Sequence, residues 1–143
     1  MRQPFDAAVG LALLLAGCAI NPDASFVQSS ASADNAVIAT NVASFLQAEL
    51  PPAHTTLLIE PAASGDQSLL ELLREDLHRQ GFAIAEPNSG AVAQPVRLMV
   101  TPLNGGFAVR IDYGLSEAAS YFGRDARGQL QANAPFVRRE TTP

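Results

Sequence analysis

The first constraint on this fold is a short apolar run near the start of the 143-residue chain. Residues 7–15 read Ala-Ala-Val-Gly-Leu-Ala-Leu-Leu-Leu and carry no charge. The run is much shorter than the roughly 20 residues that a transmembrane helix needs, and it is typical of the apolar core of a secretory signal peptide. It predicts that residues 1–17 are a targeting segment and lie outside the folded domain.

A cysteine follows this run after small residues. The sequence Leu15, Ala16, Gly17, Cys18 resembles a bacterial lipobox, where small side chains admit the signal peptidase and the cysteine thiol accepts lipid. The resemblance implies diacylglycerol on Cys18, cleavage before it, and acylation of the new amine, which labelled palmitate would report. Several acyl chains hold a protein durably, whereas one anchors it only marginally. The alternative is a short buried helix with Cys18 as an ordinary small apolar residue.

The residues after the cysteine predict destination and reach. Ala19 stands where an aspartate resembles an inner-membrane retention signal in enterobacterial lipoproteins, so the analogy implies the periplasmic face of the outer membrane. Residues 18–35 are rich in Ser, Ala and Asp and predict a lipidated N-terminus with a flexible tether. Its local apolar pair, Phe26 and Val27, is either part of a solvated linker or a short strand that docks on a protein partner.

Charge and cysteine content exclude several function classes. The formal net charge is −5, and nine scattered arginines form no basic stripe, which argues against nucleic-acid binding. The single cysteine cannot close an intramolecular disulfide. His54 and His78 fall on different predicted elements with no partner at helical spacing. We therefore expect no metal site, no cofactor and no small-molecule substrate.

Hydrophobic periodicity predicts the folded domain in residues 36–143. Apolar residues three or four positions apart predict a helix over 36–50, which Pro51 and Pro52 end. A β-branched strand follows at 55–60 and a turn at 61–66. A second, leucine-rich helix starts at a cap, Asp66 or Ser68, and closes at Gly81 before a strand over 82–86.

The second half of the domain reads as a meander. Strands are predicted over 96–101, 107–113, 115–122 and 129–138, with a hairpin turn at Asn104-Gly105. The layout predicts an α+β fold in one domain, with two helices packed on one face of a mixed, mainly antiparallel sheet of five or six strands.

An enzyme is the reading that the residues favour least. No nucleophile stands beside a base in a recognisable motif, so we expect no catalytic residues. Glu71 and Glu75 have the spacing of a carboxylate pair, but a solvated helix face explains them better. An enzyme would need a deep pocket that joins His54, His78 or this acidic face.

The lipobox and four further segments together resemble the TrbH family of conjugal-transfer lipoproteins. The further segments are Pro51-Pro52-Ala53 before a Thr-Leu strand, the leucine-arginine helix ending in Gln80-Gly81-Phe82, Ser-Glu-Ala-Ala-Ser-Tyr at 116–121, and the closing Phe136-Val137-Arg138-Arg139-Glu140. The resemblance implies a non-catalytic, structural component of a conjugative type IV secretion system, beside its core-complex proteins at the outer membrane.

The resemblance carries over one functional residue, Cys18, as the membrane anchor. Phe136 and Val137 match the family's closing strand, and they either contact a partner or finish the sheet. The alternative function is an outer-membrane assembly or transporter-auxiliary lipoprotein outside conjugation. Neighbouring genes distinguish the two.

Overall fold

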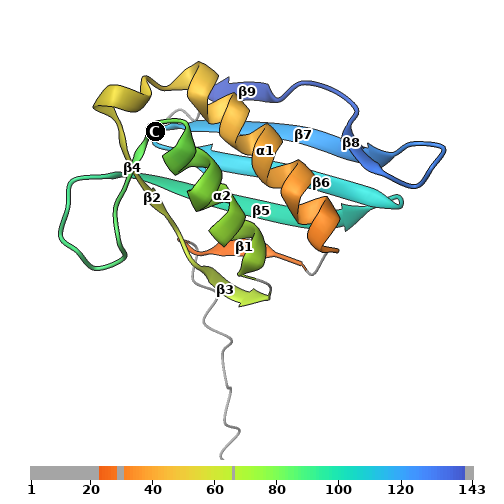
Figure 1. The fold of residues 1–143 in the computed structure, drawn as a ribbon, viewed down its shortest axis with the longest axis horizontal. Coiled ribbons are helices and arrows are strands. Elements are labelled where there is room, and N and C mark those ends of the chain that lie inside the picture. The colour runs from red at the N-terminus through yellow and green to blue at the C-terminus, as the bar shows by residue number, and fades with distance from the viewer. Residues whose placement is uncertain (1–22, 29–30, 66, 141–143) are drawn as a thin grey trace, which may run out of the picture.

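Two helices lie on one face of a single mixed sheet (Figure 1). The computed structural model describes residues 23–28, 31–65 and 67–140. In chain order the elements are β1 (Ser25–Val27), α1 (Ser32–Glu49), the 3₁₀ turn η1 (Pro52–His54), β2 (Thr56–Ile59), β3 (Ala62–Gly65), α2 (Ser68–Arg79), β4 (Ala83–Ile84), β5 (Gln94–Leu103), β6 (Gly106–Tyr113), β7 (Ser116–Arg124), β8 (Leu130–Ala132) and β9 (Val137–Glu140). The predicted α+β class is confirmed, and the described residues form nine strands where five or six were expected.

Both helices bury the apolar stripe that the sequence marks. In α1, Ile38, Val42 and Leu46 repeat every four residues and are fully buried. In α2 the stripe is formed by the buried leucines 69, 70, 73 and 77. Gly81, with a φ of +94°, ends the second helix in the left-handed conformation that glycine adopts without strain.

Three long antiparallel strands form the centre of the sheet. β5 pairs with β6 from Val96 opposite Tyr113 to Leu103 opposite Gly106, and β6 pairs with β7 from Phe107 opposite Phe122 onward. The turn between β5 and β6 uses Asn104-Gly105, as predicted, and both residues have positive φ. The predicted hairpin and the strand after it are therefore confirmed.

Each outer edge of this meander carries two short strands placed end to end. On the edge of β5, β2 pairs in parallel with residues 94–96 and β1 pairs in parallel with residues 99–100. β4 and β3 then lie outside β2 and β1. On the edge of β7, β9 pairs with residues 116–119 and β8 with residues 122–124.

Three predictions about the short strands are wrong. The tether assigned to residues 18–35 contains β1, which lies inside the sheet, and the start of α1, which begins at Ser32. The turn assigned to 61–66 contains β3, and the single last strand over 129–138 is two strands, with Pro135 between them. Strands of three or four residues bury only one or two side chains, so their local pattern is weak and distant pairing decides them.

One hydrophobic core fills the space between the helices and the sheet. Val27 of β1 belongs to it and is only 1% exposed. At its edge, Phe136 lies 4.9 Å from Phe45 and 6.2 Å from Phe122, between ring centroids. Neither α1 nor α2, the helices of the described residues, combines the length and apolar character needed to cross a bilayer.

Candidate functional site

The sheet face opposite the helices is uncovered by any described segment (Figure 1). Side chains on this open face alternate with core positions along the three long strands, as the strand geometry requires. The open face of the three central strands consists of Arg97, Met99, Thr101, Ala108, Arg110, Asp112, Glu117, Ala119 and Tyr121. A sheet with one bare face needs either a polar surface or a partner on that face.

One row across the open face joins two residues that the sequence singled out. The residues of this row are cross-strand partners, in order Phe26, Met99, Arg110, Ala119 and Val137. We call it the apolar row, since Arg110 is its one charged member. Phe26 is 41% exposed at one end and Val137 is 70% exposed at the other. Five neighbouring strands about 4.8 Å apart place these ends roughly 19 Å from each other.

The other two predicted contact residues are turned away from this row. Val27 is buried in the core of its own domain, so β1 adds to the protein's own sheet. Phe136 is half-buried against Phe45 and Phe122. Thus Phe26 and Val137 are accessible for a partner contact, whereas Val27 and Phe136 complete the fold. The predicted anchor, Cys18, and Leu15, Ala16 and Gly17 beside it lie outside the described residues.

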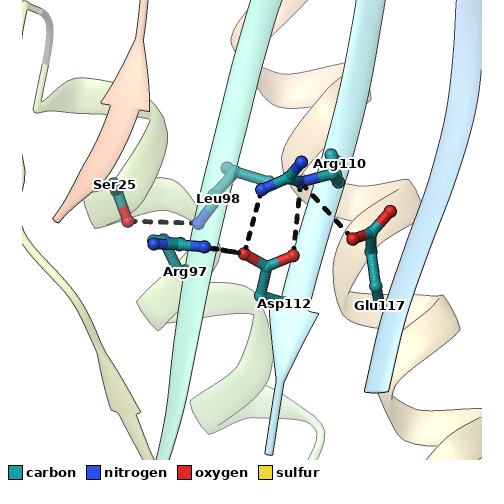
Figure 2. A network of polar contacts seen from close by, with 6 residues as sticks. All are labelled: Ser25, Arg97, Leu98, Arg110, Asp112 and Glu117. Atoms are coloured by element: carbon teal, nitrogen blue, oxygen red, sulfur yellow. Dashed lines mark hydrogen bonds and ion pairs between the residues drawn. The ribbon is translucent and has the colours of Figure 1, made fainter. Parts of the chain in front are cut away.

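A charged row runs beside the apolar row. Asp112 lies between two guanidinium groups: Arg97 Nε donates to its Oδ2 at 2.9 Å, and Arg110 Nε lies 3.3 Å from its Oδ1 (Figure 2). Arg110 also approaches Glu117 at 4.0 Å. Two cations and two carboxylates therefore neutralise one another and hold the Arg110 side chain of the apolar row against the charged row.

A buried serine holds β1 and its exposed phenylalanine in place. The Ser25 hydroxyl accepts a hydrogen bond from the Leu98 N–H at 3.1 Å and donates one to the Glu60 carbonyl at 2.6 Å. Figure 2 shows the first of these bonds beside the charged row. At this point the pairing of β5 with β2 ends and its pairing with β1 begins. The hydroxyl therefore satisfies the Leu98 N–H and the Glu60 carbonyl, which the strand pairing leaves without partners. These two bonds help to hold β1 in the register that places Phe26 opposite Met99.

A pocket of about 310 Å³ opens on the same side, near the start of β5. Its lining residues are Asp23, Glu60, Pro95, Arg97, Asp112 and Gly114. Three carboxylates and one guanidinium give it an acidic character. Sequence reasoning missed this pocket because its acidic side chains come from separate segments. Neither His54, His78 nor the acidic face of α2 lines it, so the pocket that an enzyme was expected to form is not this one.

In the part of the chain that the structure describes, no three His, Cys, Asp or Glu side chains are arranged to hold a metal ion. His54 and His78 are exposed on η1 and α2.

Two polar links connect the helices to the sheet. Arg124 of β7 forms a two-pronged ion pair with the buried Asp34 of α1, with contacts of 3.2 and 2.7 Å. Hydrogen bonding to Asp34 raises the pKa of Arg124 above its usual range. The Tyr113 hydroxyl donates to Glu49 Oε2 at 3.1 Å, and burial together with that carboxylate raises the pKa of Tyr113 above 10.0.

We compared the chain with curated proteins, solved structures and family models. No curated protein and no solved structure matches the chain. The family model described as conjugal transfer protein TrbH matches residues 20–140, which contain every described helix and strand. The match includes the open face and the closing strand on which the sequence resemblance depends. The chain belongs to the TrbH family of conjugal transfer proteins.

Proposed function

We propose that this protein is a non-catalytic lipoprotein of a conjugative type IV secretion system, held at the periplasmic face of the outer membrane by lipid on Cys18. Its role is structural: the open face contacts another protein of the transfer complex. Family membership over residues 20–140 is the observation that carries this proposal, because it associates the domain with conjugal transfer.

The open face supports the choice of contact surface. Phe26 and Val137 expose apolar area at the two ends of one row, and Arg97 and Asp112 in the neighbouring row hold Arg110, which lies between them. A few apolar anchors with polar groups around them are typical of protein contacts. The acidic pocket beside the row adds a place for a basic side chain of the partner.

The anchor is tested by metabolic labelling. A donor strain that lacks the native gene is complemented with wild type or Cys18→Ser and grown with labelled palmitate. We expect label on wild type alone, in the outer-membrane fraction, together with co-purified transfer-complex proteins. Absence of label from both forms would refute the lipid anchor. Label without those companions would favour the alternative, an assembly or transporter-auxiliary lipoprotein outside conjugation.

The contact surface is tested separately by mating. The double variant Phe26→Ser with Val137→Ser should reduce transfer frequency about tenfold or more, because the loss of about 1.4 kcal/mol of contact free energy already lowers affinity tenfold. Ala48→Ser, an exposed change on the helix side, is the matched control. Normal transfer by the double variant at normal protein level would exclude this row as the contact.

A further inference from the structure

Two exposed leucines mark opposite ends of the sheet. Leu103 ends β5 before the turn into β6 and is 48% exposed, whereas Leu115 lies in the turn between β6 and β7 and is 75% exposed. The eight residues of β6 lie between them, a length of about 27 Å at about 3.4 Å per residue. The two side chains therefore report on separate ends of the domain.

The chain enters the fold from the Leu115 end. β1 runs parallel to β5, so the residues that precede Ser25 lead back toward the start of β5. Asp23 lines a pocket with Pro95 and Gly114, and the Gly114 N–H donates to the Pro95 carbonyl at 3.4 Å. The entry point and the turn that holds Leu115 are therefore neighbours.

A second exposed apolar residue lies at this end. Val92 is 98% exposed in the connection between β4 and β5, a loop that extends beyond the start of β5 in Figure 1. Val92 precedes β5 by two residues, and Leu115 follows β6 by two residues. Because β5 and β6 are antiparallel, both residues project at one end of the sheet.

The distance to the lipid is short whatever the conformation of the intervening chain. Seven peptide links separate Cys18 from Ser25, and at most about 3.6 Å per residue they span no more than about 25 Å. Lipid on Cys18 therefore keeps the start of β1 within about 25 Å of the bilayer. Because this limit holds for the start of β1, the end of the sheet that the chain enters also stays near the bilayer.

We propose that this membrane-proximal end, with Leu115 and Val92 at its tip, rests on the bilayer surface and inserts these two side chains among the lipid headgroups. The inference depends on the lipid anchor proposed above. The acidic pocket beside it, with Asp23 and Glu60, disfavours anionic lipid, so the contact is apolar and suits a mainly zwitterionic surface. The hairpin end with Leu103 then points away from the membrane.

Fluorescent probes on the two leucines test this orientation. Full-length protein lipidated in a bacterium carries Leu115→Cys or, as the matched control, Leu103→Cys, each labelled with an environment-sensitive dye. Both are reconstituted in vesicles of phosphatidylethanolamine with a minor fraction of phosphatidylglycerol, with spin-labelled lipid as quencher. We expect the probe at residue 115 to lose most of its fluorescence and the probe at residue 103 to keep it.

Flotation separates failure of the orientation from failure of the anchor. If wild type floats with vesicles, Cys18→Ser does not, and both probes are quenched equally, the orientation is overturned while the anchor stands. Stronger quenching at residue 103 overturns it too. If wild type fails to float, the anchor and the orientation fall together. A long Gly/Ser insertion after Ala19 should abolish the difference between the probes, and its persistence would refute the role of the short connection.

Discussion

The Ser25 hydroxyl accepts a hydrogen bond from the Leu98 N–H, 73 positions further along the chain. Both groups are buried, so Ser25→Ala leaves a backbone N–H without its partner. We expect the variant to lose about 1–3 kcal/mol of unfolding free energy, measured by urea denaturation. Ser44→Ala is the control, because the Ser44 hydroxyl bonds only a carbonyl of its own helix in an exposed position. Equal urea midpoints for the two variants would show that the Ser25 bond contributes nothing to stability.

A glycine at the start of β6 allows two strands to approach. A Cβ at Gly106 would lie 2.0 Å from the Phe122 carbonyl oxygen, which no real contact permits. Gly106→Ala must therefore displace β6 from β7, and we expect a marked fall in melting temperature. Gly105→Ala faces open space and bears only the strain of its φ of +77°. The prediction fails if Gly105→Ala proves the more damaging of the two in calorimetry.

The ion pair between Arg124 and Asp34 connects β7 to α1. Arg124→Met keeps the aliphatic stem but leaves the buried Asp34 carboxylate without its guanidinium, and Arg124→Lys keeps the charge but not the two-pronged geometry. We expect the urea midpoint to fall most for Arg124→Met and less for Arg124→Lys. Arg127→Met, in the exposed turn between β7 and β8, should leave it unchanged. Any other order would contradict a structural role for the pair.

Tyr113 should make stability depend on pH in the alkaline range. Its pKa in the folded state is raised above 10.0, chiefly by burial and then by Glu49, so the folded state holds the phenol proton more tightly than the unfolded chain. Stability from this group is complete below pH 10 and falls as pH rises through the folded pKa. Tyr113→Phe should remove that part of the fall.

Tyrosinate absorbance during a pH titration and chemical denaturation at each pH provide the measurement. The control is Tyr121→Phe, which removes a phenol that bonds the Leu103 and Asn104 carbonyls on the other sheet face. If the two variants show the same alkaline profile, burial and Glu49 do not make Tyr113 a source of the pH dependence.

Long periodic elements were predictable from the sequence, and short strands were not. The apolar stripes of both helices and the alternation of β5 and β6 bury enough side chains to specify their own conformation. β1 has one buried apolar residue, Val27, and the place of the strand depends on the hydrogen bonds of the buried Ser25 with Leu98 and Glu60. Such a strand is specified by tertiary contacts that local pattern does not contain.

The candidate site was half predictable for the same reason. Phe26 was singled out as part of a local apolar pair and Val137 by the family resemblance of the closing strand, and the structure places the two in one row. The charged row beside them was not singled out, because Arg97, Asp112 and Glu117 become neighbours only through the register of three strands. Acidic and basic residues at alternate positions of adjacent predicted strands are the signal that could have found them.

The placement of β1 between β3 and β5 also determines when the domain can close. β1 precedes α1, yet both of its neighbours come later in the chain, and its pairing with Met99 and Val100 waits until β5 has been made. Contacts between such distant segments form late, because they must first close a long loop. Until then β1 remains an extended segment close behind Cys18. If Cys18 is lipidated as proposed, the modifying enzyme meets an open chain, and completion of the sheet afterwards joins the lipidated end to the domain.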